Sequence, residues 1–135
     1  MKIKLIVLCL LLATCFTAFS QESKNVAKVK SPVVKISIMY PYAEGKTFDM
    51  AYYETKHMQM VAGFLGSNLI KYTIEKGLAN GIPNQPLPFM AIGIFYVKSL
   101  SDYQAAIGPH IAAVRADFAN YTNVTPVILV SEVVK

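Results

Sequence analysis

The chain has 135 residues, of which 54% are hydrophobic and 16% are charged, and its formal net charge is +5. This length fits one globular domain, and so large a hydrophobic fraction excludes an intrinsically disordered chain. No cluster of basic residues interleaved with aromatic residues is present, so we predict no nucleic acid partner. Both cysteines, Cys9 and Cys15, lie in the first twenty residues. The remainder of the chain therefore excludes disulfides, thiolate nucleophiles and cysteine metal sites.

Residues 1–20 have the layout of a secretory signal peptide. Two lysines precede an apolar run over residues 5–13, and Ala18 and Ser20 place small side chains at the −3 and −1 positions before Gln21. The apolar segment is too short for a comfortable membrane span. We therefore predict an exported protein, periplasmic or secreted, with no stable membrane span after the signal is cleaved.

Anchoring as a lipoprotein through Cys15 is the alternative, which the bulky Thr14 before this cysteine disfavours. Residues 21–32 are rich in lysine and predict a flexible, solvated linker. Cleavage removes two lysines and leaves eleven basic against eight acidic residues, a net charge of +3. One domain is then expected over residues 33–134.

The first half of this domain predicts a strand followed by a helix. Val33–Tyr40 alternates apolar and polar side chains at period two, which is typical of a half-buried strand. Thr47 or Asp49 can cap the helix that follows, because a side-chain oxygen there accepts from a free backbone N–H. Gly66 or Asn68 marks its end.

The second half predicts two strands, a helix and a last strand. Leu69–Lys76 alternates again, and residues 77–88, with two glycines and three prolines, form a loop. Phe89–Val97 is a strand that is apolar on both faces. Ser101 begins the second helix with a glutamine three residues later, a capping-box spacing. Val124–Val133 completes the chain as a strand.

The order βαββαβ predicts a ferredoxin-like α+β sandwich. Its four-stranded antiparallel sheet carries both helices on one face. The opposite face of the third strand is still apolar, whether it presents residues 90, 92, 94 and 96 or residues 91, 93, 95 and 97. A second copy of the chain is the simplest cover for such a face, so we expect a homodimer.

The only two histidines both fall on apolar helix stripes. His57 shares spacings of three and four with large neighbours, and His110 lies on a similar stripe. The first stripe comprises Met50, Tyr53, His57, Met60, Val61 and Phe64, and the second Tyr103, Ile107, His110 and Val114. Pro109 removes a helical N–H and predicts a kink beside His110. A buried histidine that merely bonds a backbone carbonyl or a tyrosine remains the structural alternative.

Five segments of the chain together resemble the EthD (ethyl tert-butyl ether degradation) family of the dimeric α+β barrel superfamily. They are FDMAYYETKHM, KGLANGIPNQPLP, AIGIFYVKS, QAAIGPH and NYTNVTPVILVSEV. The resemblance implies a dimeric α+β barrel with a small-molecule pocket and an oxidoreductase-like or catabolic association with small organic compounds. The family commonly has proline two residues after the first histidine, where this chain has Gln59. We therefore expect its helix to run smoothly past His57.

The histidine stripes and the resemblance together predict a site for a small, mostly hydrophobic compound. We expect His57 to be the proton acceptor, since imidazole titrates near neutral pH, with His110 and Tyr53 as helpers. The predicted substrate-binding residues are Tyr40, Met60 and Ile107. We predict no metal and no cofactor, because ligands are too few and no nucleotide-binding glycine motif occurs. A non-catalytic binding or accessory protein and a purely structural dimer are the alternatives.

Overall fold

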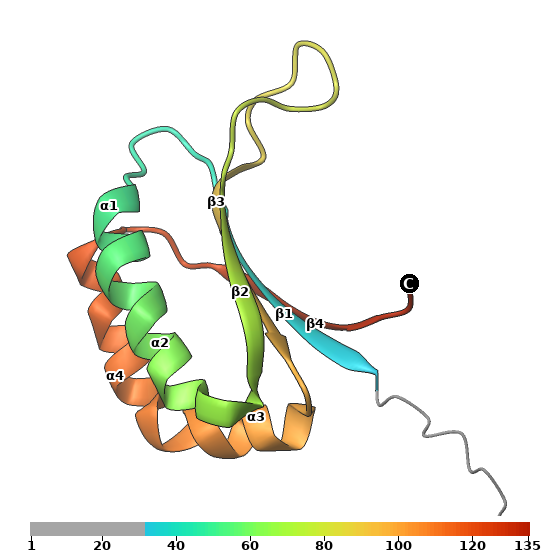
Figure 1. The fold of residues 1–135 in the computed structure, drawn as a ribbon. Coiled ribbons are helices and arrows are strands. Elements are labelled where there is room, and N and C mark those ends of the chain that lie inside the picture. Colours follow the sequence, from blue (N-terminus) through green and yellow to red (C-terminus); the bar gives the residue numbers. More distant parts are fainter. Residues whose placement is uncertain (1–31) are drawn as a thin grey trace, which may run out of the picture.

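A computed structural model describes residues 32–135 (Figure 1). The predicted signal peptide and all but the last residue of the predicted linker lie outside these residues. The elements are β1 (Val33–Pro41), α1 (Met50–Tyr52), α2 (Met58–Leu65), β2 (Leu69–Lys76), β3 (Phe89–Val97), α3 (Leu100–Ile107), α4 (Ile111–Ala116) and β4 (Val127–Val133). Short helical turns connect the helices. We call residues 50–68 the first helical arm and residues 100–120 the second.

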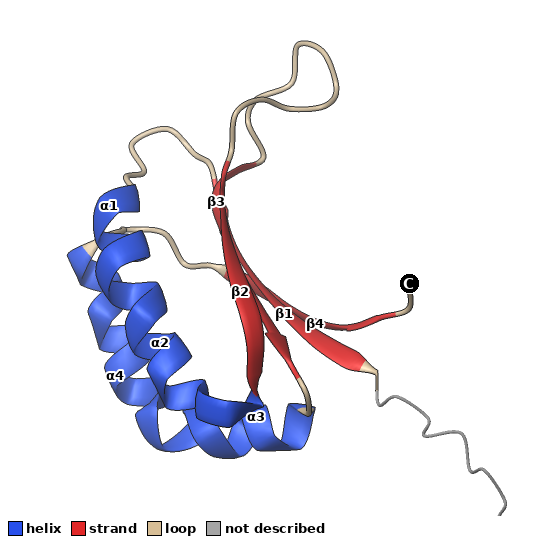
Figure 2. Cartoon of the chain, in the orientation of Figure 1, coloured by secondary structure: helices blue, strands red, loops and turns tan. Residues whose placement is uncertain are grey.

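The strands form one antiparallel sheet in the order β2-β3-β1-β4, and both helical arms cover the same face of it (Figure 2). This is the predicted ferredoxin-like βαββαβ fold. The bounds of β2 and β3 agree with the prediction. β4 begins three residues later than predicted, directly after Pro126, which cannot donate a ladder hydrogen bond.

Alternate side chains of the central strands form the core beneath the helices. Ile36, Tyr40, Ala91 and Val97 are fully buried there, and Phe95 almost so. Because β1 and β3 pair with Ile36 opposite Phe95 and Tyr40 opposite Ala91, these residues share the helix-facing side. That side of β3 therefore consists of residues 91, 93, 95 and 97.

The other face of the sheet has no helix over it within residues 32–135 (Figure 2). Ser37 pairs with Ile94 on one side and with Leu129 on the other, so these three side chains share this open face. On the edge strand β4, Val127 and Leu129 are about half exposed, at 51% and 52%. No helix in this part of the chain is long and apolar enough to cross a membrane.

The first helical arm is not the smooth helix that the sequence predicts. Asp49 caps it by accepting a hydrogen bond from the Tyr52 N–H at 3.0 Å. Tyr53–His57 is a π-helical turn, in which the Met58 N–H donates to the Tyr53 carbonyl. A π turn holds one residue more than an α turn, so it shifts the residues that follow relative to the buried face. The expectation of an undistorted helix past His57 was therefore wrong.

The second helical arm is capped two residues earlier than predicted. Ser99 rather than Ser101 accepts the Asp102 N–H, so the helix begins at Leu100. At Pro109 the helix tightens into a 3₁₀ turn over Gly108–His110, which confirms the predicted interruption. A further 3₁₀ turn, Asp117–Asn120, ends the arm.

Candidate functional site

A cavity of about 430 Å³ lies between the second helical arm, the first helical arm and the helix-facing side of the sheet. This volume is within the range of about 300–1,000 Å³ that is usual for small-molecule sites. Its lining is mostly apolar. The residues that line it are Ile38, Tyr40, Tyr53, His57, Met58, Val61, Phe95, Tyr103, Ile107, Ile111, Val114, Arg115, Phe118, Thr125, Pro126 and Ile128.

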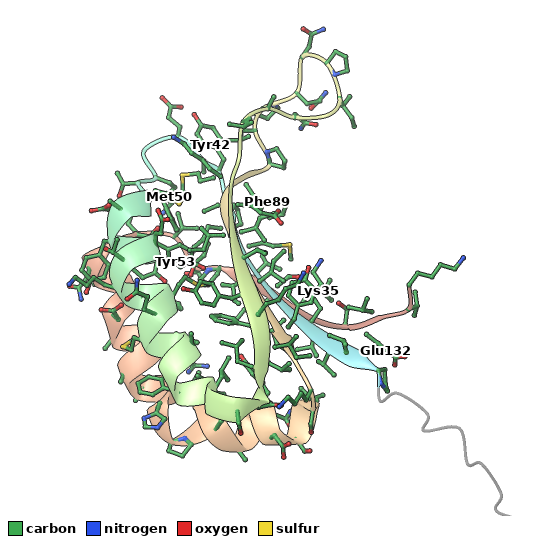
Figure 3. The ribbon with its side chains drawn as sticks, viewed as in Figure 1. Lys35, Tyr42, Met50, Tyr53, Phe89 and Glu132 are labelled. Carbon is green, nitrogen blue, oxygen red and sulfur yellow. The ribbon has the colours of Figure 1, made fainter. Side chains whose placement is uncertain are left out.

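The cavity has a deep end and a mouth. Tyr40, Tyr53 and Met58 at the deep end are almost wholly buried, and Tyr53 lies between the first helical arm and the sheet (Figure 3). At the mouth, Arg115 and Ile128 are exposed. The mouth therefore opens between α4 and the edge strand β4.

His57 and Asp117 are hydrogen-bonded to each other between the two helical arms. Nδ1 of His57 lies 2.8 Å from Oδ2 of Asp117. Oδ1 of the same carboxylate accepts hydrogen bonds from the Tyr52 hydroxyl and from Nδ2 of Asn120, each at 2.8 Å. Three donors thus fix the carboxylate. An ionised carboxylate only accepts hydrogen bonds, so the proton between Asp117 and a neutral His57 resides on Nδ1.

The environment keeps this imidazole neutral and this carboxylate ionised. Burial lowers the pKa of His57 below 6.5, and the hydrogen bond and charge of Asp117 oppose that effect without overcoming it. Burial alone would raise the pKa of Asp117. The hydrogen bonds from His57, Asn120 and Tyr52 outweigh it and hold the pKa below its usual value. The pair at neutral pH is therefore a neutral imidazole beside an anion.

Nε2 of His57 is the free nitrogen of this pair. It makes no hydrogen bond to any group within residues 32–135. Among the described side-chain nitrogen and oxygen atoms, only Oγ1 of Thr73 is both sealed from solvent and without a partner. Nε2 is therefore not sealed, and His57 is one of the residues that line the cavity. Its lone pair is available to a bound molecule.

Neutral phenols surround the imidazole. The Tyr53 ring stacks on His57 with centroids 5.5 Å apart, and the hydroxyls of Tyr40 and Tyr121 are hydrogen-bonded at 2.8 Å. Burial raises the pKa of Tyr40, Tyr53 and Tyr121 far above the physiological range, so all three retain their protons. Each is a hydrogen-bond donor that carries no charge.

A glycine in the sheet makes room for Tyr53. A Cβ atom on Gly93 of β3 would overlap the Tyr53 hydroxyl and would lie 3.2 Å from Sδ of Met58. Both of these side chains line the cavity. Gly93 is thus the position at which the sheet allows the tyrosine to reach the deep end.

The site contains no obvious metal centre within the described residues, since no three His, Cys, Asp or Glu side chains gather there.

The EthD domain family matches residues 44–125, which is more than half of the chain and includes the whole His57–Asp117 pair. The chain belongs to the EthD family. An EthD-like protein from Ralstonia eutropha JMP134 is 44% identical, and the match covers 78% of this chain and 95% of that one with a TM-score of 0.73. A family protein from Bacillus halodurans C-125 is 16% identical over 76% and 98% of the two chains, with a TM-score of 0.54, and shows the fold alone. No curated protein matches the chain.

Four residues that the sequence predicts for the site of this EthD protein come together in the structure. His57, Tyr53, Tyr40 and Ile107 all line the cavity. The chemical roles predicted for them remain proposals.

His110 and Met60 do not line the cavity. The His110 ring stacks on Phe64 with centroids 3.9 Å apart and an interplanar angle of 4°, so it lies between the two helical arms instead. Met58 occupies the cavity wall in place of Met60, because the π turn moves the residues after His57 around the helix axis. The structure therefore does not bring these two residues into the cavity, and their predicted roles stay predictions.

Sequence reasoning missed Asp117 and Arg115. Asp117 is the only acidic residue between 103 and 131, and it lies in the last turns of an otherwise apolar helical arm. A carboxylate is unfavourable near the negative end of a helix dipole, so such a residue suggests an external partner. Arg115 is the only arginine in the chain.

Proposed function

We propose that this EthD family protein is an enzyme that transfers a proton on a small, mostly apolar organic compound, with His57 as the base. The observation that carries the proposal is a neutral imidazole that lines a cavity of small-molecule size, with one nitrogen held by a carboxylate and the other free. A general base whose pKa lies below the working pH is unprotonated and can accept a proton. The name of the family, ethyl tert-butyl ether degradation, supports a catabolic setting.

The chemistry can be followed atom by atom for a substrate with an acidic C–H beside a carbonyl. Nε2 of His57 takes the proton, and the electron pair of the C–H bond moves to form an enolate. The Tyr53 hydroxyl, a neutral donor that lines the same cavity, hydrogen-bonds the enolate oxygen. The imidazolium formed at His57 is stabilised by Asp117 at 2.8 Å. Return of the proton to the same carbon gives exchange. Where a C=C bond adjoins that carbon, the electron pair extends over it, and return of the proton at its far end completes an isomerisation with no change of oxidation state.

The proposal is tested with deuterium exchange. A panel of small carbonyl compounds is incubated with the protein in D₂O, and deuterium incorporation at carbon is measured by NMR. His57→Gln keeps a polar side chain of similar reach without a base, so we expect the exchange rate to fall by about 10²–10⁴-fold. A melting curve checks that the variant is folded.

Two results would count against catalysis. If the wild-type protein binds compounds of the panel but exchanges none of them, the protein is a non-catalytic binding or accessory protein. If His57→Gln exchanges as fast as the wild type, another group is the base.

We further propose that the protein is an exported homodimer, periplasmic or secreted, in which the open sheet faces of two copies meet. The layout of residues 1–20 supports export, and the exposed Val127 and Leu129 support the contact. Burying about 500 Å² of apolar surface contributes about 12 kcal/mol before the costs of association. Leu129→Asp should convert the dimer to a monomer in light scattering, whereas a wild-type monomer at micromolar concentration would contradict the proposal.

A further inference from the structure

The stripe of the second helical arm that faces the cavity contains one charged residue. Residues 107, 111, 114, 115 and 118 recur at helical spacing, and all line the cavity. Four of them are Ile107, Ile111, Val114 and Phe118, as expected for a face turned to an apolar space. The fifth is Arg115, the charged residue of this stripe, which is exposed at the mouth of the cavity.

Nothing in the described part of the chain neutralises the Arg115 guanidinium. No carboxylate of residues 32–135 lies within ion-pairing distance of it, and Asp117 contacts His57 instead. The other ionisable side chains that line the cavity are tyrosines and His57, which are uncharged at neutral pH. Arg115 therefore contributes the formal charge of the cavity wall, and that charge is positive.

The charges of Asp117 and Arg115 determine which end of the cavity an anionic group would occupy. Asp117 does not line the cavity, but its negative charge lies 2.8 Å from Nδ1 of His57 and repels an anionic group placed beside that ring. Arg115 at the mouth attracts one, and a guanidinium binds a carboxylate through two parallel hydrogen bonds. Thr125, also at the mouth, offers a hydroxyl as a further donor. Between the two ends lie Ile107, Val114 and Ile128.

We infer that the substrates of this cavity are small organic carboxylates, held with the carboxylate on Arg115 at the mouth and the apolar body directed toward His57. The inference rests on the proposed function, since it names the class of compound on which that base acts. It makes Arg115 a binding and specificity-determining residue. The carboxylate remains outside the reacting end, so His57 removes the proton beside a second carbonyl group of the compound, whose oxygen takes up the electron pair as an enolate.

The test compares acids with their neutral esters. Phenylacetate and cyclohexanecarboxylate are titrated into the full-length protein beside their methyl esters, and dissociation constants are measured by calorimetry or NMR. Hydrogen bonds to a charged partner predict that each acid binds about 10- to 100-fold more tightly than its ester. Because the guanidinium is exposed, the difference should shrink as salt is added.

Two variants with the same change of charge identify the residue responsible. Arg115→Met should remove the preference for the acid and leave ester binding within about twofold. Lys76→Met, at the exposed end of β2 and away from the cavity lining, should leave the preference unchanged. The inference fails if the acids do not bind, if acids and esters bind equally, or if Arg115→Met retains the preference.

The outcome is separable from that of the deuterium-exchange experiment. A preference for acids that depends on Arg115, without exchange by any compound, would reject His57 catalysis and keep carboxylates as the ligands. Exchange that depends on His57, without preference for acids, would keep the base and reject Arg115 as the anchor.

Discussion

The two helical arms each carry one histidine beside a break in regular helix, yet the two rings have opposite surroundings. His57 belongs to a π turn, reaches a carboxylate from the other arm and lines the cavity. His110 closes a 3₁₀ turn and stacks on Phe64 outside the cavity. Both residues satisfy the same apolar spacing in the sequence. What separates them is a partner for Nδ1, which only a second element can supply.

The largest expected effect concerns that partner. Asp117→Asn removes the carboxylate that holds the His57 tautomer and stabilises the imidazolium, so we expect deuterium exchange to slow by about 100-fold or more. Asp102→Asn, the same change at an exposed position early in α3, should leave exchange within about twofold. If the two variants exchange deuterium at the same rate, the Asp117 carboxylate does not assist His57, and it is not what distinguishes His57 from His110.

The pH dependence follows from the lowered pKa of His57. The neutral imidazole is the base, so the exchange rate decreases below that pKa and reaches its full value above it. Since burial brings the pKa below 6.5, the rate should be level at neutral pH and fall about tenfold per unit on the acid side. In Asp117→Asn the hydrogen bond and the charge that raise the pKa of His57 are lost, and burial still lowers it. The acid limb of the rate profile should therefore move to lower pH. A titration of the His57 Cε1–H resonance measures both values.

The free energy of unfolding should also decrease on the acid side, as the exchange rate does. The unfolded chain binds the His57 proton more tightly than the folded chain, so the free energy of unfolding falls as pH drops from about 6.5 through the folded-state pKa. Asp117 has a folded-state pKa below 3.8, and its contribution is lost only as the pH falls through that lower range. Urea denaturation at pH 7.5 and 5.5 therefore isolates the histidine. An increase in stability on acidification would contradict the lowered pKa.

Two glycines provide the next comparison, because one lies under the His57 site and one does not. Gly93→Ala overlaps the Tyr53 hydroxyl and should reduce the free energy of unfolding by about 1–3 kcal/mol. Gly63→Ala, on α2 with nothing within 4 Å of the added Cβ, should increase it by about 0.5–1 kcal/mol. Chemical denaturation measures both changes. Equal shifts for the two variants would mean that the sheet does not need Gly93 to admit Tyr53.

The smallest effect is expected at the second histidine. His110→Leu loses the stack on Phe64, which is worth about 0.5–1.5 kcal/mol, and keeps an apolar contact between the arms. Exchange should remain within about threefold of the wild type, because the ring does not line the cavity. A loss comparable with that of His57→Gln would place His110 in the mechanism after all.

The fold could be predicted well from the sequence because each helix and strand is determined by residues close together in the chain. Period-two alternation set the bounds of β2 and β3, and Pro109 marked the break in the second arm. Asp49, one of the two residues expected to cap the first helical arm, is the residue that caps it. These features depend on neighbours within a few residues, which spacing and propensity describe directly.

The site was predicted only in part because its remaining features are not local. The π turn offsets the helix by one residue, and no spacing rule distinguishes Met58 from Met60 until that offset is known. Asp117 is 60 residues from His57, and their contact depends on how the arms cross the sheet. His110 lies outside the cavity for the complementary reason, since an apolar stripe in the sequence does not determine which neighbour the ring contacts.

The distance in sequence between the residues that contact one another in the site affects when the protein can fold during synthesis. The Tyr40 and Tyr121 hydroxyls meet across 81 positions, and Phe48 pairs with Thr122 as an isolated bridge. Pairings between distant segments slow folding, and a chain leaves the ribosome with its N-terminal part first. A nascent chain that has emerged only as far as β3 already exposes the imidazole but has neither the carboxylate nor the last strand. Proton-transfer competence would then be acquired at the end of synthesis, and any product truncated before residue 117 would be inert.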